Sequence, residues 1–160
     1  DTGVWLGSRL QSFNLWPEHP NVIQPGKRPR ITLTPTLVLD TQAQPVLAIS
    51  VAGGDLQDQV ALQMVVNTID LKLTPDQAVM APRFSTDHHV NSFGQAPVLG
   101  SLKVQRKIGE PIIADLKARG HDVSETAGAI AAPVLIQIDR VNKSIDAAGD
   151  PNAGRHAAAY

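Results

Sequence analysis

Residues 45–71 read PVLAISVAGGDLQDQVALQMVVNTIDL, and this stretch decides the fold. Its first part, Pro45 to Val51, is a largely apolar run of strand length with several β-branched residues. Gly53 and Gly54 interrupt it, and from Leu56 the apolar residues recur with helical spacing, at positions 56, 60, 61, 64, 65 and 69. The stretch therefore predicts a buried strand, a glycine turn and a helix in direct succession.

The segments around this unit extend the prediction. Residues 36–39 form a second apolar run, and the short polar break at 40–44 indicates a β-hairpin whose strands are buried on both faces. A second helix is expected from Thr74-Pro75-Asp76-Gln77, which carries the residues of a capping box. Strands are also predicted at 3–6, at 101–105, from Val123, at 129–138 and after Arg140, and a helix at 110–119.

The order of these elements indicates the fold class. Strands, a helix pair, a loop, a helix and further strands predict an α+β fold with helices layered on a mainly antiparallel sheet. Residues 14–31 contain four prolines and are expected to form a long irregular connection. Residues 83–100 are expected to be irregular as well.

Composition excludes several classes of protein. The chain has 160 residues, 14 basic and 15 acidic side chains, and a formal charge of −1, so it has no basic footprint for nucleic acid. No apolar run is long enough to span a membrane. The absence of Cys excludes a disulfide, a thiolate zinc site and a cysteine nucleophile. Charged residues are only 18%, which is low for a free-standing domain and suggests a fragment or a subunit that packs against a partner.

Three groups of residues are candidates for chemistry. Gly53-Gly54, between a strand and a helix N-terminus, suits an oxyanion hole, and equally a simple tight turn. Thr32 and Thr34 flank Leu33, so on an extended segment both hydroxyls face one side, where they would bind a carboxylate or merely belong to a strand. His88-His89 is interpreted as a surface loop, because adjacent residues on an extended chain rarely share one metal ion.

Taken together, segments along nearly the whole chain resemble the γ-glutamyltransferase (γ-glutamyltranspeptidase) family. Residues 24–36, QPGKRPRITLTPT, resemble its PxKRPLSSMSPT segment, and Ala52-Gly53-Gly54 resembles its SPGGSR turn. Residues 64–70 with 78–84 resemble its helix pair ending in APRFH. Residues 116–123 resemble its L…RGHxV motif, and 149–151 with 157–160 resemble its SDPR…AAGY ending.

The resemblance implies a fold and a mechanism. The family has the N-terminal-nucleophile hydrolase fold, an αββα sandwich, to which this chain would contribute part as a single partial domain, residues 1–160. A precursor cleaves itself, and the new N-terminal Thr of the small subunit becomes the nucleophile. The chain resembles the C-terminal part of that small subunit, so the nucleophile is expected before Gly3; Thr2 is rejected because its distance from the later motifs is wrong. Gly53 and Gly54 match the oxyanion-hole glycines, which favours the catalytic interpretation of the turn.

Several positions depart from the family pattern and bear on the substrate. Where the family has LSSMS, whose serines help to hold a substrate carboxylate, this chain keeps a hydroxyl only at Thr32. Where the family has NNQMDDF, which supplies an acid for the substrate's amino group, this chain has Ser12 in the acid's place and Arg9 nearby. Asp55, with Gln57 and Asp58 after it, also differs from the family's SR. We expect Arg9, Ser12, Thr32 and Asp55 to contact a substrate whose acyl group is acidic or otherwise altered.

The resulting functional hypothesis is an amidohydrolase or acyltransferase of this family that transfers an acyl group from an amide through a Thr acyl-enzyme. Its expected partners are the large subunit of the same precursor and a small-molecule amide, with no cofactor, metal, nucleic acid or membrane. Two alternatives stay open: a non-catalytic binding module of the same fold, and an amidase of altered specificity that resembles cephalosporin acylases or oxamate amidohydrolases. The sequence leaves the compartment open between periplasm and cytoplasm.

Overall fold

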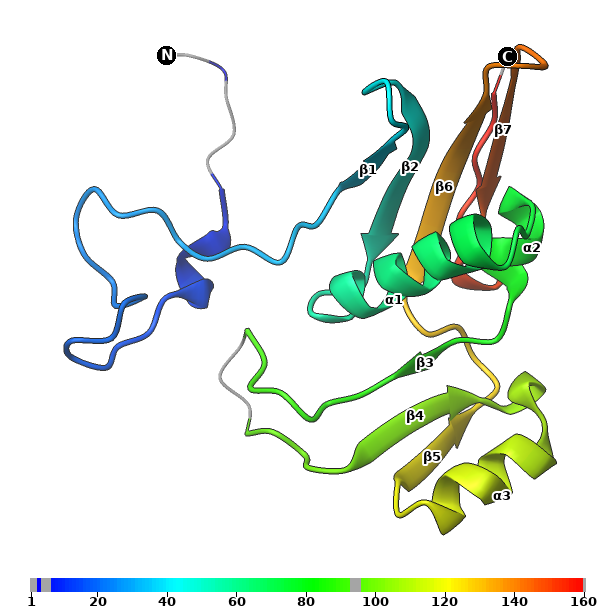
Figure 1. The fold of residues 1–160 in the computed structure, drawn as a ribbon. Helices are drawn as coiled ribbons and strands as arrows, with labels where there is room; N and C mark the ends of the chain where they lie inside the picture. The colour runs from blue at the N-terminus through cyan, green and yellow to red at the C-terminus, as the bar shows by residue number, and fades with distance from the viewer. Residues whose placement is uncertain (1–2, 4–6, 93–95, 160) are drawn as a thin grey trace.

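The computed structural model describes residue 3 and residues 7–92 and 96–159, which form two sheets with helices packed on them (Figure 1). Most of the strand predicted at residues 3–6, like Thr2 and Tyr160, lies outside the described residues. The larger sheet has four strands in the order β1-β2-β6-β7. The smaller has three strands in the order β3-β4-β5.

The larger sheet is antiparallel throughout. Its strands are β1 (Thr36–Leu39), β2 (Pro45–Ala52), β6 (Ala132–Asp139) and β7 (Ser144–Gly149). The predicted hairpin is confirmed, with Leu37 opposite Ala48 in β2. Strand β2 then pairs with β6, which lies 80 positions or more further along the chain. The two central strands thus come from distant parts of the sequence, and the sequence patterns, which predicted the hairpin, did not predict that β2 would pair with β6.

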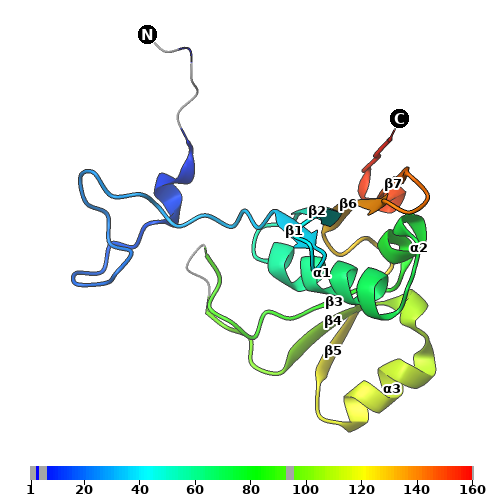
Figure 2. The same ribbon diagram turned by 45° about the horizontal axis from the view of Figure 1, so that its top comes forward.

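Helices cover one face of this sheet (Figure 2). They are α1 (Leu56–Val65), which continues as a short π-helical segment η2 (Val66–Asp70), and α2 (Pro75–Met80). The predicted capping residues act as expected, because the side chain of Gln77 accepts the Thr74 N–H at 3.1 Å. The core lies between these helices and the sheet and contains Leu47, Ile49, Val51, Val60, Met64, Val79 and Leu135. Within the described part of the chain, no helix is both long and apolar enough to cross a membrane.

No described helix or strand covers the opposite face of the larger sheet. Burial alternates along β2, so that Leu47, Ile49 and Val51 are buried while Ser50 and Ala52 are exposed. Leu37 is 60% exposed and Ile136 is 38% exposed, and both lie across from Ala48 on the open side. The prediction that these strands are buried on both faces is therefore wrong for the described part of the chain, in which only the C-terminal tail borders the second face.

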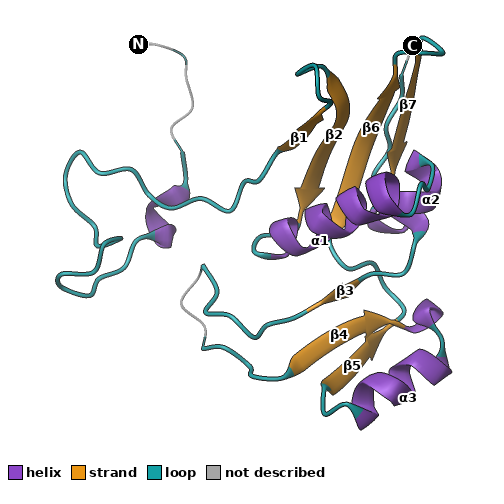
Figure 3. Cartoon of the chain, in the orientation of Figure 1, coloured by secondary structure: helices purple, strands orange, loops and turns teal. Residues whose placement is uncertain are grey.

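The smaller sheet lies beside the helix layer (Figure 3). It consists of β3 (Phe84–Ser85), β4 (Ser101–Gln105) and β5 (Asp122–Thr126), and α3 (Glu110–Ala118) connects the parallel pair β4 and β5. The side chains of Gln59 and Gln63 in α1 connect the smaller sheet to the helix layer by hydrogen bonds. The Gln63 amide exchanges two hydrogen bonds with the backbone of Phe84, at 2.9 and 3.1 Å, and Gln59 does the same with Thr86. Each glutamine side chain thus satisfies the strand's backbone as a neighbouring strand would.

The described N-terminal residues, up to about residue 29, form an arm that extends away from both sheets (Figure 1). It contains the 3₁₀ turn η1 (Arg9–Ser12) and most of the proline-rich connection 14–31, which is irregular as predicted. At the other end of the chain, the 3₁₀ turn η4 (Pro151–Ala153) follows β7 and leads into the C-terminal tail.

Candidate functional site

The glycine turn lies where β2 leaves the sheet and α1 begins. The Gly53 carbonyl accepts the Leu56 N–H at 3.1 Å, and the Gly54 carbonyl accepts the Gln57 N–H at 3.2 Å. Both glycines therefore belong to the first turn that leads into α1. The N–H groups of Gly53 and Gly54 donate no hydrogen bond to any described residue. Two free backbone donors at the positive end of a helix form an arrangement that suits an anion or a polarised oxygen.

Each glycine is required for a different physical reason. Gly54 has a φ of 59°, a left-handed conformation that residues with a side chain rarely adopt. Gly53 lies so close to the loop before β6 that an added Cβ would be 2.8 Å from the Cβ of Ala131. The sequence predicted the turn, but the close approach of Ala131 depends on the pairing of β2 with β6.

Asp55 fixes the loop that follows β3 against this turn. Its carboxylate accepts the Ser92 N–H at 2.7 Å and also the Ser92 hydroxyl. A cavity of about 330 Å³ opens beside it, lined by Arg30, Asp58 and His89 among others. The structure therefore places Asp55 next to the glycine turn, where both of its oxygens are engaged by Ser92.

Thr32 and Thr34 behave as their spacing predicted. Thr32 is 7% exposed whereas Leu33 between them is 58% exposed, so the segment alternates. The hydroxyls of both threonines are buried and have no hydrogen-bond partner among the described residues. Buried hydroxyls normally find partners, so these two are candidates for contact with a molecule outside this chain.

Gln57 connects this threonine segment to the glycine turn. Its Oε1 accepts the backbone N–H of Thr34 at 3.4 Å, and the residue is 6% exposed. A cavity of about 280 Å³ lies here, and Leu33, Gly53, Gln57 and Arg155 contribute to its lining. The sequence indicated neither Gln57 nor Arg155 as a wall of the same cavity, because they are almost 100 positions apart and the tail carries no recognisable motif at Arg155.

Arg9 and Ser12 lie elsewhere, on η1 in the N-terminal arm. Ser12 is 3% exposed, its hydroxyl has no partner, and its carbonyl accepts a hydrogen bond from the Asn21 side chain. No hydrogen bond joins Arg9 or Ser12 to the described residues of either sheet. The structure thus brings Gly53, Gly54 and Asp55 together near Thr32, and does not bring Arg9 and Ser12 to the same place.

The two adjacent histidines lie in the irregular loop before β4. Their rings meet edge to face with centroids 5.9 Å apart, and His88 Nδ1 accepts the Gly100 N–H at 3.0 Å. Among the described residues, no group of three or more His, Asp or Glu side chains is placed to hold a metal ion.

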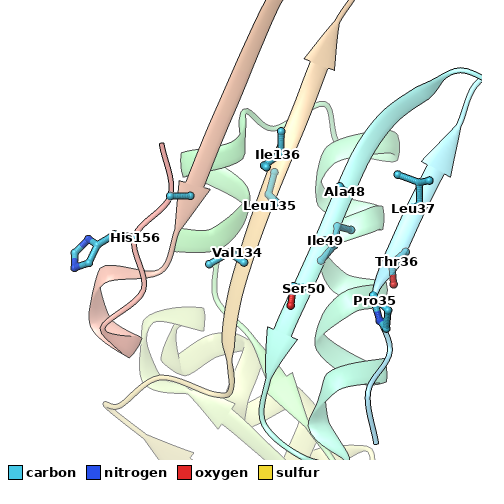
Figure 4. A pocket seen from close by; sticks show the side chains of 11 residues that line it. Pro35, Thr36, Leu37, Ala48, Ile49, Ser50, Val134, Leu135, Ile136 and His156 are labelled. Carbon is cyan, nitrogen blue, oxygen red and sulfur yellow. The ribbon is translucent and has the colours of Figure 1, made fainter. Parts of the chain in front are cut away.

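An apolar groove of about 520 Å³ runs over the uncovered face of the larger sheet (Figure 4). Leu37, Ala48, Val134 and Ile136 line it, together with the Ser50 hydroxyl, and His156 of the tail borders it. Ser50 and Val134 also line the smaller cavity beside Gly53. The groove and the glycine turn therefore share one face of the molecule.

Comparison with known proteins gives consistent matches. The family model described as Gamma-glutamyltranspeptidase matches residues 1–160. The glutathione hydrolase proenzyme of Bacillus subtilis is 26% identical over 94% of this chain and 24% of its own length. The oxamate amidohydrolase proenzyme of Klebsiella pneumoniae is 29% identical over the whole chain and 30% of its own length. Among solved structures, cephalosporin acylase from Bacillus halodurans superposes with a TM-score of 0.74 at 29% identity, over 88% of this chain and 25% of that one.

These matches confirm the fold predicted from the sequence motifs. The structural neighbours are N-terminal-nucleophile hydrolases, which agrees with the mixed helix-and-sheet layers observed here. The chain spans less than a third of the length of the curated relatives it matches, which are hydrolase proenzymes. Because the family model covers every residue, the chain belongs to the gamma-glutamyltranspeptidase family.

Proposed function

We propose that this chain is the part of a small subunit that supplies the oxyanion hole of an amide-cleaving N-terminal-nucleophile enzyme. The observation that carries the proposal is the glycine turn, where two N–H groups at the start of α1 have no partner among the described residues. Backbone donors held in this way stabilise the negative charge that develops on a carbonyl oxygen in the transition state. Removing one such donor typically lowers the rate by a factor of roughly 10² to 10³.

The proposed reaction has two halves. The hydroxyl oxygen of an N-terminal Thr, in the part of the small subunit that precedes this chain, attacks the amide carbon, and its proton passes to the Thr α-amine. The oxyanion is held by the N–H groups of Gly53 and Gly54 until the C–N bond breaks, when the α-amine gives the proton to the leaving amine. Water or an acceptor amine then attacks the acyl-enzyme in the same way and releases the acid or the new amide.

The uncovered face of the larger sheet supports the proposed partnership with the rest of the precursor. Leu37, Leu39, Ile136 and Ile145 are between 38% and 60% exposed. Apolar side chains arranged along one sheet face are expected to pack against a second layer. We propose that this layer comes from the remainder of the precursor, including its large subunit, because the curated relatives are more than three times as long as the match.

The test uses the full-length precursor after maturation and compares Gly54→Pro with Gly26→Pro. Both glycines have positive φ, at 59° and 75°, and neither donates a hydrogen bond to a described residue, but Gly26 lies in the proline-rich arm. The substrates are a set of p-nitroanilides, which are chromogenic amides. The intact mass of the protein shows whether the precursor has been cleaved and whether an acyl-enzyme forms. We expect Gly54→Pro to lose at least 100-fold in kcat and Gly26→Pro to keep its activity.

Two results would contradict the proposal. Full activity in a matured Gly54→Pro enzyme would show that the Gly54 N–H takes no part in the reaction. A wild-type precursor that neither cleaves itself nor forms an acyl-enzyme with any donor would support the non-catalytic binding module instead. A Gly54→Ala variant keeps the N–H, so it separates loss of the donor from strain in the left-handed backbone.

A further inference from the structure

A polar cavity of about 270 Å³ lies at the carboxyl ends of the parallel strands β4 and β5, whose arrows point the same way in Figure 3. Its lining comes from the end of β4 with the 3₁₀ turn η3 (Arg106–Ile108), from the end of β5, and from the turn η4. The lining residues are Gln105, Arg106, Lys107, Thr126, Ala127 and Asn152. In open sheets built from β–α–β units, ligands bind beyond the carboxyl ends of the strands, so the cavity has the position of a ligand site.

The described lining of this cavity contains two cations, Arg106 and Lys107, and no acid. The one ion pair of Arg106 with a described residue is loose, at 3.7 Å between its Nε and Oε2 of Glu125. Glu125 precedes Thr126 on β5, so the two side chains lie on opposite faces of the strand. Glu125 also accepts from Lys117 Nζ at 3.3 Å. The nearest acid is thus shared with a third cation and leaves the cavity positively charged.

Lys107 is held at the cavity by the end of α2. Its Nζ donates to the carbonyl of Met80, the last residue of that helix, and the described residues offer no second acceptor for the three ammonium hydrogens. Partial burial lowers the pKa of the Lys107 ammonium, and the guanidinium of Arg83 lowers it further, whereas Asp150 raises it. The cation therefore lacks compensating negative charge, which an anion in the cavity would supply.

Two uncharged side chains add donors to the same lining. The Thr126 oxygen accepts the Gly128 N–H at 3.0 Å, so its own hydrogen remains to donate and meets no acceptor among the described residues. The Asn152 amide nitrogen lies 3.8 Å from the Met80 sulfur, a weak acceptor, and has a second hydrogen to donate. Gln105 differs, because both ends of its side-chain amide are bonded to backbone groups. It forms a wall of the cavity, and the donors for a ligand come from η3, β5 and η4.

We propose that this cavity binds a phosphoryl group, to which Lys107 and Arg106 supply positive charge and Thr126 and Asn152 supply neutral hydrogen bonds. A phosphate accepts hydrogen bonds from all sides, so it suits donors that converge from three elements better than a planar carboxylate does. The cavity, at about 270 Å³, also has room for a small phosphate monoester. A ligand here would connect the smaller sheet to the turn after β7 and stabilise the folded protein. None of the lining residues belongs to the glycine turn, so the inference does not depend on the proposed function.

The experiment titrates the matured full-length protein with inorganic phosphate by calorimetry, at an ionic strength kept constant with sodium chloride. Wild type is expected to show saturable binding. Lys107→Gln is expected to weaken it by roughly 10-fold or more, the worth of a charge-assisted hydrogen bond. Arg106→Gln, at a more exposed side chain, is expected to weaken it by roughly 3-fold. Lys143→Gln and Arg140→Gln make the same changes in the exposed turn between β6 and β7 and should leave the affinity unchanged.

Thermal unfolding separates a ligand site from a purely structural role of Lys107 at the end of α2. Phosphate should raise the unfolding temperature of wild type more than sodium chloride of equal ionic strength does, and this extra rise should be lost in Lys107→Gln. A variant that is less stable but keeps the full extra rise would show that Lys107 only caps the helix, and the site would be wrong. Glu125→Gln frees Arg106 and should tighten phosphate binding by roughly 3-fold. An equal gain in Asp122→Asn, at the other end of β5, would indicate general charge attraction and overturn the assignment.

Two further probes identify the chemistry of the ligand. Glycerol phosphate is compared with inorganic phosphate, and the tighter of the two shows whether the site takes an ester or the free ion. Acetate should bind more weakly than either. Equal binding of acetate, or no saturable binding of either phosphate probe to wild type, would overturn the proposal. All of these measurements are made without an amide substrate, so their outcome is separate from the test of the proposed function.

Discussion

Arg83 and Asp150 form a fully buried ion pair, although 67 positions of sequence separate them. Arg83 Nε also donates to the Ile130 carbonyl at 2.9 Å, and a second guanidinium nitrogen donates to the Val79 carbonyl. Asp150 in turn accepts the Asn152 N–H at 2.8 Å. The pair therefore joins the end of α2, the loop before β6 and the turn after β7 at a single point in the core.

The first prediction concerns this pair. Arg83→Met leaves a buried carboxylate without its partner and is expected to lower the free energy of unfolding by about 3–5 kcal/mol. The double variant Arg83→Met/Asp150→Leu is expected to lose less than the sum of the single changes, because both charges are then gone. Chemical denaturation of the matured protein measures this. Arg119→Met, which removes an exposed pair with Asp115, should change stability by no more than about 0.5 kcal/mol.

The second prediction concerns the glutamines that bind β3. Gln63→Ala removes both hydrogen bonds to the Phe84 backbone and should cost about 1–2 kcal/mol of stability. Gln63→Glu still accepts the Phe84 N–H and should lose less. The exposed Gln42, whose side chain bonds to no described residue, provides the control Gln42→Ala. Equal stability of Gln63→Ala and Gln42→Ala would show that these hydrogen bonds contribute nothing.

The third prediction concerns the close approach of Gly53 and Ala131. Gly53→Ala places a Cβ 2.8 Å from the Cβ of Ala131 and should cost about 1–3 kcal/mol. Adding Ala131→Gly removes the obstructing methyl group and relaxes a residue with a φ of 55°. The double variant should therefore be more stable than Gly53→Ala alone. Thermal unfolding of the two variants checks this, and a double variant no better than the single one would rule out the steric explanation.

The fourth prediction concerns Asp55 as a positioning residue for the part of the loop after β3 that contains Ser92. Asp55→Ala removes both contacts with Ser92 and should increase proteolytic cleavage within residues 86–92. Ser92→Ala keeps the backbone N–H and should have a smaller effect. Asp58→Ala, which changes an exposed acid on the same turn of α1, is the control. If Asp55 acts on catalysis through this loop, kcat/KM and resistance to the protease should follow the same order. Both should be lowest in Asp55→Ala, higher in Ser92→Ala and close to wild type in Asp58→Ala.

Much of the local structure followed from short-range patterns. Each correctly predicted element depends on residues that are close together in the sequence. These elements are the hairpin 36–52, the helix that begins at Leu56, the capping box at Thr74 and the helix that ends near Gly120. The motifs along the chain also identified the family. The division into two sheets could not be predicted in the same way, because strand periodicity does not specify which strands become neighbours.

The candidate site shows the same division. The sequence determined the glycine turn, the same-sided Thr32 and Thr34, and the family to which both belong. Only the tertiary structure placed Gln57 and Arg155 on one cavity beside Gly53, and left Arg9 and Ser12 on a separate arm. The physical reason is that a turn is fixed by the backbone of adjacent residues, whereas a binding cavity is formed by the packing of β2 against β6 and of the tail against β7. Such long-range contacts leave no periodic trace in the sequence.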